Sequence, residues 1–161
     1  MTLALPELRA YHADISDVPA LVKRIPPRVQ LLRADRVYGP DHLTLAAQLA
    51  ARALAEGRAR SADIATETLV YAAGERQIGK ALVFLGLHEG AQTVAAVAWD
   101  PAALDAFAAR ERWRREDALL EGDESVLDAF HVSAAERALF PRERWGDIIL
   151  ERVALTDVLK A

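Results

Sequence analysis

The chain has 161 residues, the usual length of one domain, so residues 1–161 are expected to form a single compact domain around one hydrophobic core. Hydrophobic residues make up 52% of the sequence and charged residues 27%, which excludes an intrinsically disordered chain. The net charge of −4 excludes a protein that attracts nucleic acid over its whole surface, so any RNA contact must be a local patch.

The sequence has no cysteine, which excludes disulfides and thiolate metal sites. The longest apolar run, residues 94–99, is far shorter than the roughly 20 residues that span a bilayer. Residues 1–10 lack the basic and apolar regions of a signal peptide. We therefore expect a cytoplasmic protein without membrane contact.

The first predicted elements are two strands, at residues 8–15 and 28–34. Residues 17–25 between them predict a short helix, which Pro26 and Pro27 end because proline cannot continue it.

Residues 39–56 predict a longer helix, with Pro40 in its first turn and Gly57 after its last periodic residue. Residues 63–73 fit a helix or a strand by pattern alone, because residues 69–71 are a short apolar run, and we favour the helix.

Residues 75–85 have helical periodicity, and Gly86 is their expected stop. The valine-rich run at 93–99 is too short for a helix and predicts a strand buried on both faces. Asp100 then caps a helix predicted over residues 101–115.

Ser133 and Glu136 have the spacing of a capping box, which predicts a short helix that Pro141 ends. A final helix is predicted at 144–159. Together these elements predict an α+β fold, with a small mixed or antiparallel sheet packed against several helices.

The sequence offers no set of residues for catalysis. His12, His42, His88 and His131 lie in four separate elements without metal-ligand spacing, and we expect them to be satisfied at surfaces or turns. No serine has the flanking glycines of a nucleophile elbow. We therefore expect no catalytic residue, no metal and no cofactor.

One segment, residues 74–81, fits the GxxxxGK pattern of a phosphate-binding loop. Ala81 replaces the hydroxyl residue that should hold magnesium, and the helical period continues through Gly79. A nucleotide-binding enzyme is therefore a weaker alternative.

The same segment read as a helix places Arg76 and Lys80 four residues apart on one face. Like charges at this spacing suit an anion bound between them, and the neighbouring Gln77, Val83 and Phe84 suit a nucleotide base. Solvated cations with a core phenylalanine are the alternative that the pattern leaves open.

A second basic cluster surrounds Trp113 at the end of the helix predicted over 101–115; its members are Arg110, Arg112, Arg114 and Arg115. Cations are favoured at a helix C-terminus, and the acidic residues 121–124 that follow would repel RNA. We therefore expect this cluster to be an ordinary solvated helix end.

A family resemblance is carried by residues 64–86, where the matching positions are Glu67, Leu69, Gly74, Arg76, Gln77, Ile78, Ala81, Leu82 and Gly86. These residues resemble the central signature of the PRPK-binding (TPRKB) subunits of the KEOPS complex, in their archaeal form, since the eukaryotic pattern does not keep the Arg-Gln pair. Softer matches occur at 32–35, at His42, Leu43 and Ala46, and at 151–159. The arginine-rich residues 102–117 have no match.

The resemblance implies a non-catalytic subunit of the complex that makes threonylcarbamoyl-adenosine in tRNA. Such subunits bind the small atypical kinase, which contacts the threonylcarbamoyl transferase, and they hold the 3′ CCA end of tRNA. Arg76, Gln77, Lys80, Val83 and Phe84 are then the expected tRNA site. An adaptor that touches only protein is a further alternative.

The predicted C-terminal helix ends with more apolar surface than packing on one side requires. Leu155, Val158 and Leu159 are therefore the expected contact with the kinase.

Overall fold

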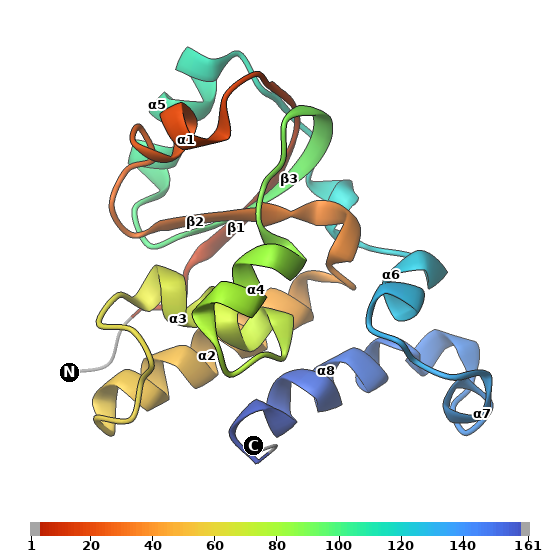
Figure 1. Ribbon diagram of the computed structural model, residues 1–161. Helices are drawn as coiled ribbons and strands as arrows, with labels where there is room; N and C mark the ends of the chain where they lie inside the picture. The colour runs from red at the N-terminus through yellow and green to blue at the C-terminus, as the bar shows by residue number, and fades with distance from the viewer. Residues whose placement is uncertain (1–3, 159–161) are drawn as a thin grey trace.

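An antiparallel sheet with the strand order β2-β3-β1-β4 forms the centre of the fold (Figure 1). The computed structural model describes residues 4–158. The strands are β1 (Glu7–Ile15), β2 (Val29–Arg33), β3 (Gly90–Ala98) and β4 (Arg114–Arg115). β1 pairs with β3 from Glu7 opposite Ala98 to Ile15 opposite Gly90, and β2 pairs with the other side of β3.

The helices are α1 (Val18–Val22), α2 (Pro40–Ala55), α3 (Ile64–Ala73), α4 (Ile78–Leu85), α5 (Pro101–Glu111), α6 (Glu124–Ala129), α7 (Ala134–Arg137) and α8 (Gly146–Ala154). Short 3₁₀ turns lie at Ala34–Arg36 (η1), Asp117–Leu120 (η2), Arg142–Arg144 (η3) and Leu155–Asp157 (η4). The α+β class with an antiparallel sheet is confirmed. Among the described helices, none has both the length and the apolar character needed to cross a bilayer.

Helices cover both faces of the sheet. Ala95 and Val97 of β3 pack into the cluster formed with α2 and α3, whereas Val94 and Ala96 pack into the cluster formed with α1 and α5. Figure 1 shows α1 and α5 on one side of the strands and α2, α3 and α4 on the other. The predicted burial of this strand on both faces is therefore confirmed.

The helix α3 is buried nearly all round, with only Thr66 partly exposed among its ten residues. An element enclosed on every side has no polar face, so its period is hidden. This explains why the sequence pattern fitted a strand as well as a helix.

Three predicted helix bounds are corrected. α4 begins at Ile78, not at residue 75, because Gly74 takes a left-handed conformation (φ 66°) that ends α3, and residues 75–77 form the connection. α5 ends at Glu111 because Arg112 is left-handed (φ 60°). α8 ends at Ala154 and continues as the turn η4, and position 159 of the predicted helix lies outside the described residues.

The helix α6 was not predicted. Its sequence follows an acidic stretch, and Asp123 accepts a hydrogen bond from the backbone nitrogen of Ser125 as its N-cap. The predicted cap of α7 is confirmed for Ser133, whose hydroxyl accepts a hydrogen bond from the backbone nitrogen of Glu136 at 3.1 Å. The Glu136 carboxylate binds Arg152 at 2.7 Å instead of completing the capping box.

Candidate functional site

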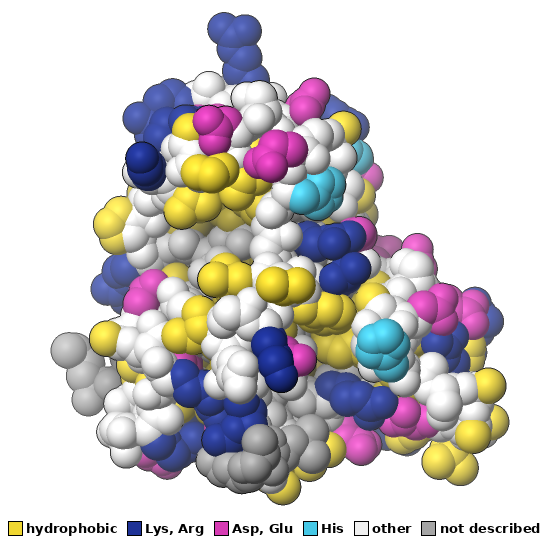
Figure 2. Space-filling model, viewed as in Figure 1, with side chains coloured by type: hydrophobic (Ala, Val, Ile, Leu, Met, Phe, Trp, Pro, Cys, Tyr) yellow, Lys and Arg dark blue, Asp and Glu magenta, His cyan; other side chains and the backbone are white. Residues whose placement is uncertain are grey.

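Four arginines come together around one pocket of about 430 Å³. We call it the arginine pocket, and its lining residues are Arg52, Arg58, Arg60, Arg76, Ala154, Asp157 and Val158. They come from α2, the α2–α3 connection, the α3–α4 connection, the end of α8, the turn η4 and the residue that follows it. Figure 2 shows Lys and Arg side chains gathered in the lower part of the view, near the place where α8 ends in Figure 1.

Two glycines with positive φ turn the chain so that these arginines meet. Gly57 (φ 70°) ends α2, and the backbone nitrogen of Arg58 donates to the carbonyl of Ala53 at 3.0 Å. Gly74 ends α3 in the same conformation and brings Arg76 back towards η4. Only glycine takes this conformation readily, so both positions are needed for the layout of the pocket.

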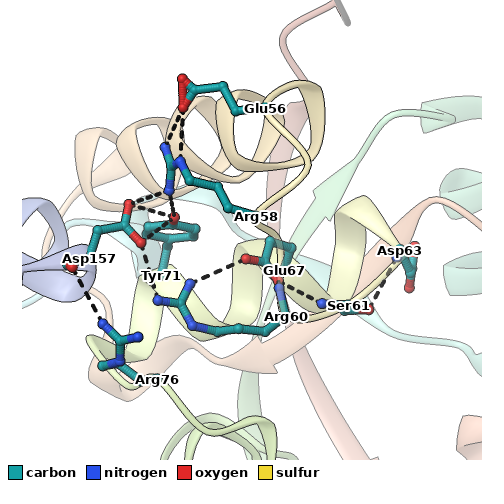
Figure 3. A network of polar contacts seen from close by, with 9 residues as sticks. All are labelled: Glu56, Arg58, Arg60, Ser61, Asp63, Glu67, Tyr71, Arg76 and Asp157. Atoms are coloured by element: carbon teal, nitrogen blue, oxygen red, sulfur yellow. Dashed lines mark hydrogen bonds and ion pairs between the residues drawn. The ribbon is translucent and has the colours of Figure 1, made fainter. Parts of the chain in front are cut away.

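The carboxylate of Asp157 is the centre of a hydrogen-bond network within the pocket (Figure 3). The Tyr71 hydroxyl lies 2.7 and 2.8 Å from its two oxygens, and Arg58 and Arg60 donate to it at 3.0 and 3.1 Å. Burial alone would raise the pKa of Asp157, but the hydrogen bonds from Tyr71, Arg60 and Arg58 outweigh it and lower the pKa. Asp157 is therefore a carboxylate at neutral pH.

A buried carboxylate fixes Arg60 from behind. Glu67 is fully buried and accepts hydrogen bonds from the backbone nitrogens of Arg60 and Ser61 at 2.9 and 3.0 Å. It also lies 3.4 Å from the Arg60 guanidinium, which stacks over the Tyr71 ring. Arg58 is held in a similar way, by Glu56 at 2.8 Å.

Several cations here are not neutralised. Within residues 4–158, neither Arg52, Arg76 nor Lys80 forms an ion pair with a carboxylate. Arg76 instead donates to the backbone carbonyl of Asp157 at 3.3 Å. Unpaired guanidinium groups beside a pocket are suited to bind an anion.

The structure places the five predicted tRNA-site residues in different surroundings. Because α4 starts at Ile78, Arg76 and Lys80 do not share a helix face, and that expectation was wrong. Gln77 is the exposed N-cap of α4, and Lys80 is exposed in its first turn. Val83 is 84% exposed.

Phe84 is partly buried, which answers the question of whether it belongs to the core. Its ring packs edge to face on Phe130 with centroids 4.9 Å apart, and the Arg36 guanidinium lies 4.7 Å from its centre. Arg36 also donates to the Phe84 carbonyl at 2.7 Å. Little of the ring is left to stack on a base.

The predicted kinase contact lies next to the arginine pocket. Leu155 is partly buried, Val158 is 67% exposed and lines the pocket, and Leu159 lies outside the described residues. Arg76 and Val158, which the sequence assigned to two different partners, therefore line the same pocket.

The described chain has a second hollow, which we call the apolar groove, between the α1–β2 region and α4. It measures about 660 Å³, and Val22 and Leu82 on its two sides are each about half exposed. Hydrophobic side chains are visible on both sides of this hollow in Figure 2. Exposed apolar side chains on facing walls are typical of a protein contact.

The structure does not support the other two candidate sites, the GxxxxGK segment and the second basic cluster. The GxxxxGK segment follows the helix α3, whereas a phosphate-binding loop follows a strand. Arg114 and Arg115 form the edge strand β4 and pair with Glu116 and Asp117, so this half of the second basic cluster is not a helix end. Arg110 and Arg112 lie in the last turn and at the C-cap of α5, as predicted.

The histidines also lie apart. His42 is fully buried, contrary to the expected surface or turn position. His12 lies 2.8 Å from Glu116 at the surface. Within residues 4–158, no group of three His, Asp or Glu side chains could hold a metal ion.

Sequence reasoning missed Arg52, Arg58, Arg60, Tyr71 and Asp157. The signal present was Arg58 and Arg60 flanking one residue directly after the glycine that ends a helix. Their meeting with Asp157, about 100 positions away, had no local signal.

The described residues form an α+β fold that gathers four arginines at one pocket. The family model of the kinase binding protein CGI-121 matches residues 12–139, and the chain belongs to this family. This match confirms the family resemblance found in the sequence and supports a kinase as partner. A search of curated proteins finds no significant match.

Proposed function

We propose that this protein is the kinase-binding subunit of a cytoplasmic KEOPS complex and holds the 3′ CCA end of tRNA at the arginine pocket and the adjoining start of α4. In this role the kinase links it to the threonylcarbamoyl transferase, and the chain itself carries out no reaction. The tRNA part is supported by cations that form no ion pair with a carboxylate within residues 4–158. They are Arg52 and Arg76 in the pocket and Lys80 in the first turn of α4.

The protein as a whole repels a polyanion, since its net charge is −4. Attraction must therefore come from cations close together, and the arginine pocket provides them. A single-stranded CCA end exposes its phosphates and bases, and the exposed Gln77 and Val83 beside Lys80 can contact a base.

The test measures tRNA affinity at several salt concentrations, with intact tRNA and with tRNA lacking its CCA end. Each lost phosphate contact lowers the slope of log affinity against log salt by about 0.7. Arg76→Ala and Lys80→Ala should therefore weaken the binding of intact tRNA and flatten its salt dependence. Arg110→Ala is the matched control, because Arg110 is exposed on α5 beyond the opposite face of the sheet.

The tRNA proposal fails if Arg76→Ala and Lys80→Ala bind intact and truncated tRNA as the unmutated protein does. An adaptor that touches only protein would show no salt-dependent tRNA affinity at all. A nucleotide-binding enzyme would instead bind magnesium ATP, which equilibrium binding to the purified chain detects.

For the kinase contact we keep the C-terminal segment Leu155, Val158 and Leu159 as the proposed surface. The exposed Val158 side chain supports it. Val158 also lines the arginine pocket, so a kinase bound at Val158 would crowd a tRNA end beside Arg76. The apolar groove is therefore the competing surface for the kinase.

A further inference from the structure

Three donors from the α2–α3 region converge on a single carboxylate (Figure 3). The Tyr71 hydroxyl, the Arg58 guanidinium and the Arg60 guanidinium all donate to Asp157, at 2.7 to 3.1 Å. A phosphate oxygen accepts the same charge-assisted hydrogen bonds as a carboxylate oxygen. The site is thus chemically an anion site, filled by a side chain of the protein itself.

We propose that Tyr71, Arg58 and Arg60 form a phosphate subsite for RNA, and that Asp157 occupies it when RNA is absent. An RNA phosphate displaces the Asp157 carboxylate and takes its hydrogen bonds. This inference rests on the proposed tRNA function, and it adds residues and a competing internal anion to that site.

The donors keep their positions without Asp157, because each arginine has a second carboxylate. Arg58 pairs with Glu56 at 2.8 Å, and Arg60 pairs with the buried Glu67 at 3.4 Å. Arg60 is further held by its contact with the Tyr71 ring. A site that remains formed after its occupant leaves can accept another anion at little cost in reorganisation.

Asp157 can leave by rotation of its side chain alone. Its neighbour Thr156 is 1% exposed and lies within 3.3 Å of the Arg152 carbonyl, which holds the turn η4 in place. The Asp157 side chain itself is 27% exposed, so solvent lies on its open side. Displacement therefore needs no unfolding of η4.

The exchange leaves the charge balance of the pocket unchanged. Four arginines line the pocket, and the carboxylates in contact with them are Glu56, Glu67 and Asp157. Removing Asp157 adds one positive charge to the balance, and one phosphodiester restores it. Asp157 consequently lowers the affinity for RNA below that of the empty pocket.

The variant Asp157→Asn removes the negative charge at nearly constant shape. Its control is Glu151→Gln, which makes the same charge change at an exposed position of α8 that lines no part of the pocket. Two measurements are made on each full-length protein: tRNA affinity against salt, and the melting temperature in inorganic phosphate compared with sodium chloride of equal ionic strength.

The expected result for Asp157→Asn is tighter tRNA binding, by about fivefold at 0.1 M salt, with a salt slope steeper by about 0.7. Phosphate should raise its melting temperature by about 2–4 °C more than it raises that of the unmutated protein. Glu151→Gln should match the unmutated protein in both measurements.

The inference is overturned if Asp157→Asn folds but shows the tRNA slope and the phosphate effect of Glu151→Gln. If Asp157→Asn does not fold, Arg58→Gln replaces it, because this change removes one donor of the proposed subsite at a partly exposed position. The inference is then overturned if Arg58→Gln binds tRNA with the affinity and salt slope of the unmutated protein. Absence of tRNA binding by the unmutated protein defeats the proposed function instead, and the phosphate measurement still decides whether the subsite exists.

Discussion

The Nε2 atom of His42 lies 2.8 Å from the carbonyl oxygen of Ala72, which joins the first turn of α2 to the end of α3. On the other side of the ring, Nδ1 accepts a hydrogen bond from the backbone nitrogen of Tyr38 at 3.1 Å. An acceptor at Nδ1 requires the proton to be on Nε2, so the neutral ring satisfies both contacts. The ring is fully buried, and its partner Ala72 lies two positions before Gly74, which ends α3.

Burial lowers the pKa of His42 from 6.5 to about 4, despite the opposing hydrogen bond to Ala72. Between these two values the unfolded chain binds a proton at His42 that the folded chain does not. The contribution of His42 to the free energy of unfolding should therefore be constant above pH 6.5. It should fall by about 3 kcal/mol as the pH drops towards 4. Urea unfolding at intervals of pH measures this slope.

The control for this prediction is His42→Gln, which should be less stable at pH 7 but should lose the dependence on pH between 4.5 and 6.5. The carboxyl groups with lowered pKa, such as Glu136 with its ordinary value of 4.5, lose their stabilising effect only at lower pH. If His42→Gln shows the same slope between pH 4.5 and 6.5, the slope comes from other titrating groups.

Phe84→Ala should lower the free energy of unfolding by about 2 kcal/mol, because the ring is only partly buried and a fully buried phenylalanine costs about 3–5. The lost contacts are those with Phe130 and Arg36. Val83→Ala, at the exposed neighbouring position, should change stability by no more than about 0.5 kcal/mol. Weaker tRNA binding by Phe84→Ala at unchanged stability would show that the ring stacks on a base instead.

Much of the fold could be predicted because it depends on local signals. Proline in the first turn and glycine after the last turn placed α2 to within one residue, and the short valine-rich run identified β3. Two of the bounds that were wrong, the start of α4 and the end of α5, follow from a single residue in a left-handed conformation. Arg112 takes this conformation at the end of α5, and an arginine at that position does not predict it.

The candidate site was predictable only in part, for a related reason. Arg76 was found because it lies inside the signature, but its place in the connection before α4 changed its neighbours from Lys80 to Asp157. Asp157 and Tyr71 are 86 positions apart, and only the packing of α8 and η4 against α3 brings them together. Periodicity describes the face of one element and cannot report which distant element covers it.

The kinase contact can be assigned by comparing two charge substitutions. Val158→Glu places a carboxylate on the C-terminal surface, and Leu82→Glu places one on the wall of the apolar groove. Both side chains are at least half exposed, so neither change should lower stability by more than about 0.5 kcal/mol. A charge buried at a protein interface without a partner costs several kcal/mol, so the variant at the true contact should lose kinase binding by at least about 100-fold.

We expect Val158→Glu to be that variant, measured by titration of the chain with the small atypical kinase of the proposed complex. Val83→Glu serves as a control, since Val83 is more exposed than Leu82 and lines neither the arginine pocket nor the groove. Loss of binding in Leu82→Glu alone would move the kinase to the apolar groove. That outcome would leave the arginine pocket open to tRNA while the kinase is bound, whereas a contact at Val158 predicts that bound kinase reduces the affinity of the chain for tRNA.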